Sequence, residues 1–194
     1  YYLDFETYQS AIPPFNLLKP YQQIPFQYSI HLENDNKIDH YEFLSQSSLY
    51  DSREDFIKSL INHIGLEGDI IVYNMSFEKS RLKELICDFP EYNIPLQSII
   101  DRMKDLMIPF KEKWYYTPSM KGSYSIKSVL PSLVPSLSYE KLSINNGALA
   151  SAEFINLHKI TDSEKIKTIR KNLLEYCELD TFALVKIVDF LKSI

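Results

Sequence analysis

Residues 1–7 read Tyr-Tyr-Leu-Asp-Phe-Glu-Thr, a stretch in which apolar and acidic side chains alternate. Successive side chains of a β-strand point to opposite faces, so Asp4 and Glu6 share one face and Leu3 and Phe5 share the other. At a rise of about 3.3 Å per residue, the two acidic Cα atoms lie about 6.5–7 Å apart. A divalent cation between the carboxylates would relieve their repulsion. The alternative interpretation is a strand whose polar face is simply exposed to solvent.

Strand and helix patterns continue from this strand in an order typical of an α/β domain. They predict strands over 1–6, 26–33, 38–44, 69–73 and 96–100, and helices over 53–64, 77–88, 125–130, 145–157 and 161–191. We expect Ser76 and Thr161 to be the N-caps of the second and the last helix. A Pro-rich stretch over 12–25 and a turn over 34–37 predict irregular structure. A hairpin followed by alternating strands and helices indicates a mixed five-stranded sheet with helices on both faces.

Length and composition favour one domain, residues 1–194, with its own core. Apolar residues make up 45% of the chain, and no run of them approaches the about 20 residues that cross a bilayer. No signal peptide is apparent. The two cysteines, Cys87 and Cys177, are far apart, which argues against a disulfide scaffold or a zinc site and favours a reducing cytoplasm. We expect both to be buried apolar positions, and the start at Tyr1, inside a strand, to mark a piece of a longer protein.

A net charge of −5 argues against a nucleic-acid coat protein, yet one segment is locally basic. Residues 102–127 contain six Lys or Arg against two acidic residues, and Trp and Tyr side chains lie among them. Because bases stack on aromatic rings and lysines bind phosphates, the segment is a candidate for single-strand binding. The alternative is a solvated loop that contributes some aromatic rings to the core.

Two acidic residues occupy positions where the helical pattern predicts core side chains. Glu78 shares a face with Leu82, Leu85 and Phe89, although a first-turn glutamate also stabilises a helix N-terminus through the dipole. Asp180 falls within the apolar stripe of the last helix. Tyr176 lies one turn earlier, so a buried Asp–Tyr hydrogen bond is the alternative there.

Asp4, Glu6, Glu78 and Asp180 therefore come from three elements and are all expected to face inward. Clustered without a counter-charge, they would raise one another's pKa strongly or unfold the domain. Two divalent cations would relieve this repulsion. Ligand sets made only of oxygen atoms favour Mg²⁺ or Mn²⁺.

Three segments, in this order, resemble the DEDD superfamily of 3′–5′ exonucleases, which have the RNase H-like fold. The first, Leu3-Asp4-Phe5-Glu6-Thr7, matches Asp-x-Glu on the first strand. The second, Asn74-Met75-Ser76-Phe77-Glu78, is similar to Asn-x-x-Phe-Asp. The third, Tyr176-Cys177-Glu178-Leu179-Asp180, matches Tyr-x-x-x-Asp. A tyrosine in the third motif marks the DEDDy branch. Glu78 departs from the pattern, because the superfamily usually has Asp there. The residues of the motifs also resemble an uncharacterised bacterial family within this superfamily. Members of that family can have a RecB-like nuclease domain beside this one in a longer protein.

The resemblance implies a metal-dependent 3′–5′ exonuclease that hydrolyses phosphodiester bonds of DNA or RNA. Asp4, Glu6, Glu78 and Asp180 would hold two Mg²⁺ or Mn²⁺ ions, and Tyr176 would orient or deprotonate the attacking water. Asp101, at the end of the fifth predicted strand, resembles a recurrent aspartate behind the ligands. Two alternatives stay open: an inactive RNase H-like module that binds nucleic acid or a partner, and an endonuclease of the same fold.

The substrate is expected to be a nucleic acid with a single-stranded 3′ end. Five residues are candidate substrate contacts: Thr7, Asn74, Lys121, Tyr124 and Lys127. Ordinary strand propensity is the alternative for Thr7, and a helix cap is the alternative for Asn74. We expect the four histidines to have surface or structural positions, because none lies at a motif spacing.

Overall fold

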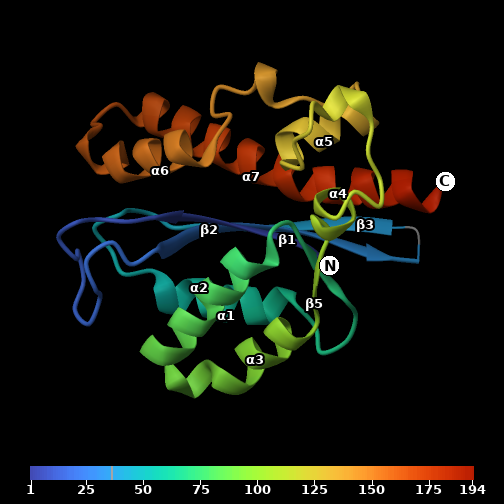
Figure 1. The fold of residues 1–194 in the computed structure, drawn as a ribbon. Coiled ribbons are helices and arrows are strands. Elements are labelled where there is room, and N and C mark those ends of the chain that lie inside the picture. Colours follow the sequence, from blue (N-terminus) through green and yellow to red (C-terminus); the bar gives the residue numbers. More distant parts are fainter. Residues whose placement is uncertain (36) are drawn as a thin grey trace.

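The strand that carries Asp4 lies at the centre of a five-stranded mixed sheet (Figure 1). The computed structural model describes residues 1–35 and 37–194. The strands follow the order β3-β2-β1-β4-β5 across the sheet, with β1 antiparallel to β2 and parallel to β4. Their bounds are Tyr2–Tyr8 (β1), Ile24–Asn34 (β2), Lys37–Leu44 (β3), Ile70–Val72 (β4) and Met103–Asp105 (β5). The predicted fold class, an RNase H-like mixed sheet with helices on both faces, is confirmed.

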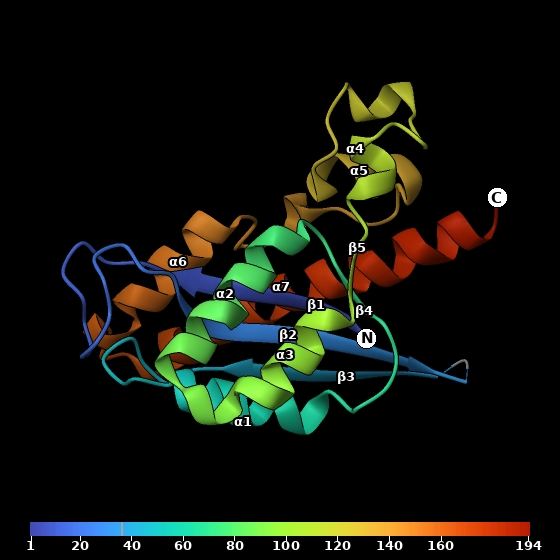
Figure 2. The same ribbon diagram turned by 60° about the horizontal axis from the view of Figure 1, so that its bottom comes forward.

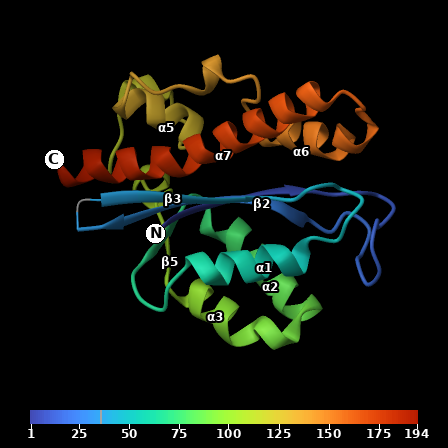
Figure 3. The ribbon, with the colours of Figure 1, turned by 180° about the vertical axis from the view of Figure 1, so that it is seen from behind.

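Helices cover both faces of the sheet, as Figures 1 and 3 show from opposite sides. One face is covered by α1 (Arg53–His63), α2 (Met75–Asp88) and α3 (Asn93–Asp101). The other is covered by α5 (Ile126–Leu133), α6 (Gly147–Asn156) and the long α7 (Ser163–Lys192). Shorter helical segments are α4 (Ile108–Lys111), η1 (Pro90–Tyr92), η2 (Pro118–Met120), η3 (Tyr139–Lys141) and η4 (Leu157–Lys159). Among the described residues, no helix combines the length and the apolar character that crossing a membrane requires.

Strand β1 separates two hydrophobic cores because its side chains alternate between the faces. Leu3 and Phe5 pack under α1, where the rings of Phe5 and Phe56 meet edge to face with centroids 5.3 Å apart. Tyr8 belongs to the opposite core, beneath α6 and α7. Asp4 and Glu6 share the face of Tyr8, so the first strand places both acidic residues under α7, next to an apolar core.

The prediction of a strand over 96–100 is wrong. These residues lie in α3, where Leu96, Ile99 and Ile100 are buried at helical spacing, and the fifth strand is β5. A short apolar run does not distinguish a strand from a buried helix by its pattern alone. The displaced strand also changes which acidic residue ends it, from Asp101 to Asp105.

The remaining differences concern helix starts and one cysteine. Asn74 and Asp162, rather than Ser76 and Thr161, precede the first residues of α2 and α7. Asp162 accepts hydrogen bonds from the backbone N–H groups of the first turn, which is the usual action of an N-cap aspartate. Cys177 is buried as predicted, but Cys87 is exposed on α2. Of the predicted turn over 34–37, residue 36 lies outside the described residues.

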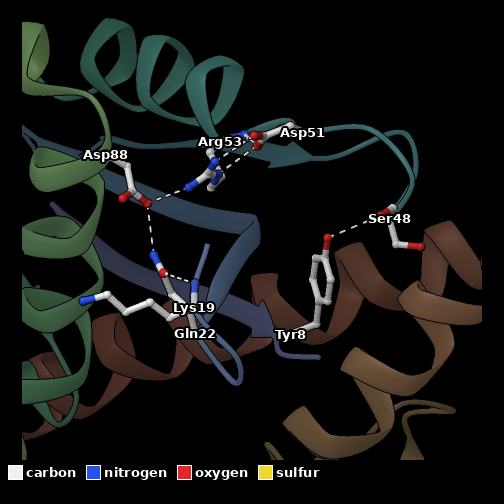
Figure 4. Close-up of polar contacts among 7 residues, drawn as sticks. All are labelled: Tyr8, Lys19, Gln22, Ser48, Asp51, Arg53 and Asp88. Carbon is white, nitrogen blue, oxygen red and sulfur yellow. Dashed lines mark hydrogen bonds and ion pairs between the residues drawn. The ribbon is translucent and has the colours of Figure 1, made fainter. Parts of the chain in front are cut away.

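A buried arginine and its partner Asp88 connect α1 and α2 to the irregular segment between β1 and β2, as Figure 4 shows. Arg53 at the start of α1 is 4% exposed and forms ion pairs with Asp51 and Asp88. Asp88, at the end of α2, also accepts a hydrogen bond of 3.0 Å from the Gln22 side chain. Asp88 therefore joins α1, α2 and the segment over 9–23, which borders the site described below.

We predict that Asp88→Ala lowers the free energy of unfolding by about 2 kcal/mol, because it leaves the buried Arg53 guanidinium short of an acceptor. Glu84→Ala is the matched control on the same helix, since it removes only the partly exposed pair with Arg81. We expect the control to cost less than about 1 kcal/mol. Urea denaturation of the two variants measures the difference, and equal losses would contradict a structural role for Asp88.

Candidate metal centre

Three carboxylates from the two ends of the chain meet between β1 and α7. Asp4, Glu6 and Asp180 each place one carboxylate oxygen within 4.8 Å of those of the other two. Glu6 is 8% exposed and Asp180 is 7% exposed. Strand alternation brings the first two together, and the helical stripe brings the third to the same place, as the sequence predicts. Three carboxylate oxygens this close together could bind one divalent cation after small side-chain adjustments.

Glu78 lies in the same cavity but outside this group of three. It is 2% exposed in the first turn of α2, just past the end of β4. Its Oε2 is buried and has no hydrogen-bond partner among the described residues. A buried carboxylate oxygen without a donor is costly, so this atom lacks a partner that a cation or an ordered water would supply. The prediction that Glu78 faces inward is confirmed.

Strand β5 supplies the acidic residue that positions the start of α2. Asp105 accepts hydrogen bonds of 3.0 Å from the backbone N–H groups of Asn74 and Met75. Asn74 has a φ of 69°, in the left-handed region that Asn tolerates better than most residues. The prediction that Asp101 lies behind the ligands does not agree with this arrangement. Asp101 is exposed at the end of α3 and accepts a hydrogen bond from Gln97, because the strand expected to end there is a helix.

Two tyrosines flank Asp180, and the sequence pattern predicted one of them. Tyr176 is buried one turn before Asp180, as predicted. Tyr139 donates a hydrogen bond of 2.7 Å to Asp180 Oδ1, and its ring centroid lies 6.2 Å from that of Tyr176. Tyr139 comes from η3, a segment without helical or strand periodicity, so no pattern in the sequence pointed to it. Its hydroxyl fixes the orientation of the Asp180 carboxylate.

One lysine brings positive charge to the cavity. Lys127 Nζ donates a hydrogen bond of 2.6 Å to the Asn145 carbonyl and lies 5.5 Å from the centroids of both Tyr139 and Tyr176. A cation over two aromatic faces is held by both ring quadrupoles. Lys127 therefore stands at the wall of the cavity with its ammonium group close to the carboxylates.

The cavity has a volume of about 500 Å³ and collects most of the predicted substrate contacts. Thr7, Asn74 and Lys127 line it, together with the four acidic residues and Tyr176. Lys121 and Tyr124 are exposed and do not line it. Tyr124 is nevertheless attached to the wall, because its carbonyl accepts a hydrogen bond from the Tyr73 hydroxyl.

Burial is the largest cause of a raised pKa at all four carboxyl groups. Burial raises the pKa of Glu6 and that of Glu78 each to about 8. It also raises the pKa of Asp180 to about 6. The pKa of Asp4 rises well above its ordinary value, first through burial and then through the charges of Asp180, Glu6 and Glu78. The ionised cluster is therefore unfavourable unless a positive charge joins it.

Histidines play no part in this cavity. None of the four lines it, and each forms a hydrogen bond elsewhere in the described chain, as the prediction of structural positions requires. His31 bonds to the Thr181 side chain and His40 to that of Ser29. His63 bonds to the Tyr28 hydroxyl and His158 to the Ile155 carbonyl.

Comparison with known proteins identifies a family. Residues 1–125 match the family described as "Domain of unknown function (DUF2779)". The chain belongs to this family. No solved structure matches the chain.

Curated relatives match along the whole chain. An uncharacterised protein of Ureaplasma parvum serovar 3 is 32% identical over 216 residues, covering 100% of this chain and 31% of the relative. An uncharacterised protein of Mycoplasma pneumoniae is 29% identical over 214 residues, covering 99% of this chain and 32% of the relative. An uncharacterised Mycoplasma genitalium protein is also 29% identical. The chain thus spans about a third of the length of the curated relatives it matches.

The raised pKa values predict how the stability of the metal-free protein changes with pH. Between the ordinary carboxyl pKa and about 8, the folded protein binds more protons at Glu6 and Glu78 than the unfolded chain does. Stability contributed by these groups is therefore present at low pH and is lost as pH rises through this window. Glu6→Gln removes one such group. In the presence of a chelator, the melting temperature of the variant relative to that of the wild type should therefore rise from about pH 5 to about pH 8. A difference independent of pH would contradict the raised pKa of Glu6.

Proposed function

We propose that this domain is a metal-dependent 3′–5′ exonuclease that hydrolyses phosphodiester bonds. One observation carries the proposal. Three carboxylates from β1 and α7 converge within 4.8 Å, and a fourth, buried carboxylate with an unpartnered oxygen lines the same cavity. Such an arrangement is unfavourable for a purely structural core, because each carboxylate raises the pKa of its neighbours. It suits chemistry that needs divalent cations and an anionic substrate.

The donor set fits two hard cations. Every ligand is a carboxylate oxygen, which favours Mg²⁺ or Mn²⁺ over metals that prefer nitrogen or sulfur. Asp4, Glu6 and Asp180 would hold one cation, and Asp4 and Glu78 would reach the second. When bound, the cations would lower the pKa of the attacking water and neutralise the charge on the scissile phosphate.

The protein's own residues would orient the reacting groups. In the protein without metal, burial raises the pKa of the Tyr176 hydroxyl most, and the charges of Asp180, Glu6 and Asp4 raise it further. With cations bound to those carboxylates, Tyr176 would orient the attacking water or deprotonate it. Tyr139 holds the Asp180 carboxylate through its hydroxyl. Lys127 would attract the phosphate into the cavity by its charge.

The basic and aromatic segment is well placed to bind the rest of the strand. Figure 2 shows α4 and α5 projecting from the body of the domain near β4 and β5. Trp114 is 74% exposed in this region, and Tyr116 and Tyr124 are also exposed. Exposed aromatic rings among lysines stack bases and bind phosphates with little sequence preference. We propose a single-stranded 3′ end of DNA or RNA as the substrate.

The full-length protein is a separate question. Because the chain spans about a third of its curated relatives, a longer protein has room for further domains. A RecB-like nuclease domain beside this one stays a prediction of the family resemblance.

We predict that the protein, supplied with Mn²⁺, shortens a single strand labelled at its 5′ end one nucleotide at a time. Asp180→Asn should lower the rate at least about 100-fold, since even a residue behind a metal ligand contributes about 10–100-fold. Gel analysis of DNA and RNA substrates measures the products. Asp189→Asn, which changes an acidic residue at the surface of the same helix, is the matched control and should retain full activity.

The same assay separates exonuclease from endonuclease activity. A strand with a blocked 3′ end should resist the protein. Cleavage of the blocked strand would show an endonuclease of the same fold instead. Failure to cut any substrate while still binding single strands would show the inactive module, an alternative that the longer Glu78 side chain favours.

Metal binding can be tested without activity. We predict that Mn²⁺ raises the melting temperature of the wild type and that Asp4→Asn abolishes most of the shift, because Asp4 is central to the cluster. Asp39→Asn, an exposed acidic residue on β3, is the control and should show the wild-type shift. Equal shifts for both variants would place the ion elsewhere on the surface and would overturn the proposed centre.

A further inference from the structure

A second cluster of metal-ligand side chains lies on the same face of the sheet, one strand away from the acidic centre. His31 on β2 and His40 on β3 are direct partners in the antiparallel register. Their ring centroids are 4.6 Å apart, with the planes tilted by 32°. Glu178 on α7 completes the cluster from above the sheet. None of these three residues lines the acidic cavity.

The spacing of this cluster fits a metal ion. One ring nitrogen of His31, one of His40 and one carboxylate oxygen of Glu178 all lie within 4.8 Å of one another. Zinc binds histidine nitrogen at about 2.0–2.1 Å and carboxylate oxygen at about 2.0–2.2 Å, so the ligand atoms must approach somewhat further. His40 is half-buried and Glu178 is exposed, so both side chains have room to make that adjustment. His31 is 5% exposed and provides the fixed side of the site.

A chain of hydrogen bonds behind the two rings holds them in place. The Ser29 and Thr181 hydroxyl oxygens lie 2.7 Å apart; His40 Nε2 contacts Ser29 and His31 Nδ1 contacts Thr181. The Thr181 hydroxyl also contacts the Glu178 carbonyl at 3.1 Å. A carbonyl only accepts, so Thr181 donates to it. Ser29 must then donate to Thr181, and each histidine must donate to its hydroxyl.

This assignment is the one that satisfies all four contacts, and it leaves each neutral ring one lone pair. In the part of the chain that the structure describes, no hydrogen bond reaches the second nitrogen of either ring. Histidine ligands of metals characteristically use one nitrogen for the metal and anchor the other through a hydrogen bond. The Ser29–Thr181 pair provides that anchor for both rings. Glu42, the register partner of Ser29, adds a further carboxylate beside the cluster.

We propose that His31, His40 and Glu178 form a transition-metal site of the zinc class that joins strand β3 to helix α7. Two imidazole nitrogens and one carboxylate suit Zn²⁺ and its neighbours, whereas the acidic centre, with oxygen ligands alone, suits Mg²⁺ or Mn²⁺. The three protein ligands leave one tetrahedral position for water. A metal here ties β3, an edge strand of the sheet, to the helix that carries Asp180, at a place where the hydrogen bonds from His40 to Thr181 run through Ser29 of β2.

Cobalt absorption distinguishes this site from the acidic centre. Co²⁺ in a four-coordinate site with nitrogen ligands absorbs visible light strongly, whereas six-coordinate Co²⁺ with oxygen ligands absorbs weakly. The protein should carry Cys87→Ser, because Cys87 is an exposed thiol that binds the same metals. We expect one equivalent of Co²⁺ to give strong absorption that Zn²⁺ displaces.

Variants locate the ion. Glu178→Gln should weaken Co²⁺ and Zn²⁺ binding by about tenfold or more. It should leave folding unchanged because the Glu178 side chain is exposed. His40→Asn should weaken binding similarly. Glu175→Gln, on the same helix and paired with Lys171, is the matched control and should bind like the parent. Asp4→Asn should also bind like the parent, so the result does not depend on the proposed nuclease centre.

Two results would overturn the proposal. Weak absorption of the six-coordinate kind would show that Co²⁺ binds through oxygen ligands alone. Strong absorption that Glu178→Gln and His40→Asn leave unchanged would place the metal elsewhere, and the cluster would then be a hydrogen-bonded network without an ion.

Discussion

The repulsion among carboxylates under α7 is the constraint on which the functional half of the structure depends. β1 lies at the centre of the sheet, so the acidic face of that strand cannot turn to solvent without exposing Leu3 and Phe5 from the core beneath α1. α7 is held over it by its own apolar stripe, which brings Asp180 into the same space. The fold therefore keeps the acidic residues together by hydrophobic packing, and burial raises the pKa of each of them. Hydrophobic packing thus offsets the cost of burying the carboxylates together, and binding of a cation would make the same arrangement favourable.

The neighbours of the cluster moderate this repulsion without removing it. Tyr139 donates to Asp180, and Lys127 brings a positive charge that lowers the pKa values of Glu6 and Asp180 against the larger effect of burial. Gly147, the first residue of α6, belongs to the same wall, and a Cβ atom there would lie 3.3 Å from Glu6 Oε2. The absence of a side chain at Gly147 thus leaves the Glu6 carboxylate room to reorient. These contacts come from α5, η3 and α6, so the segment between β5 and α7 shapes the site as much as the motif-bearing elements do.

Burial of one face gives a strand or a helix a periodic pattern of apolar residues. The elements with such a pattern were the ones that the sequence predicted. Asp180 and Glu78 were visible because each interrupts an apolar stripe, and a polar residue in such a place needs a physical reason. Tyr139 gave no such signal, because the residues of η3 have no periodic apolar pattern that a functional residue could interrupt. The prediction of a strand over 96–100 was wrong for a related reason, because a short apolar run fits a strand and a buried helix equally well. The pairing of His31 with His40 follows from the hairpin register, but the approach of Glu178 needs the docking of α7, which depends on contacts between residues far apart in the sequence.

Helix α7 connects the two clusters through adjacent residues. Asp180 faces the acidic cavity, and Thr181 bonds to Ser29 and His31 in the histidine cluster. A helix turns by about 100° per residue, so one segment of α7 presents both side chains to the sheet only at one rotation about its axis. Cys177, one turn earlier, packs against the Asp4 backbone with its sulfur 3.9 Å from the carbonyl oxygen. Any rotation or sliding of α7 that improved one cluster would therefore displace the other. The hydrogen bonds of Thr181 and the position of Asp180 are for this reason a single structural feature, and the contacts that hold α7 against β2 also help to set the distance between Asp180 and Asp4.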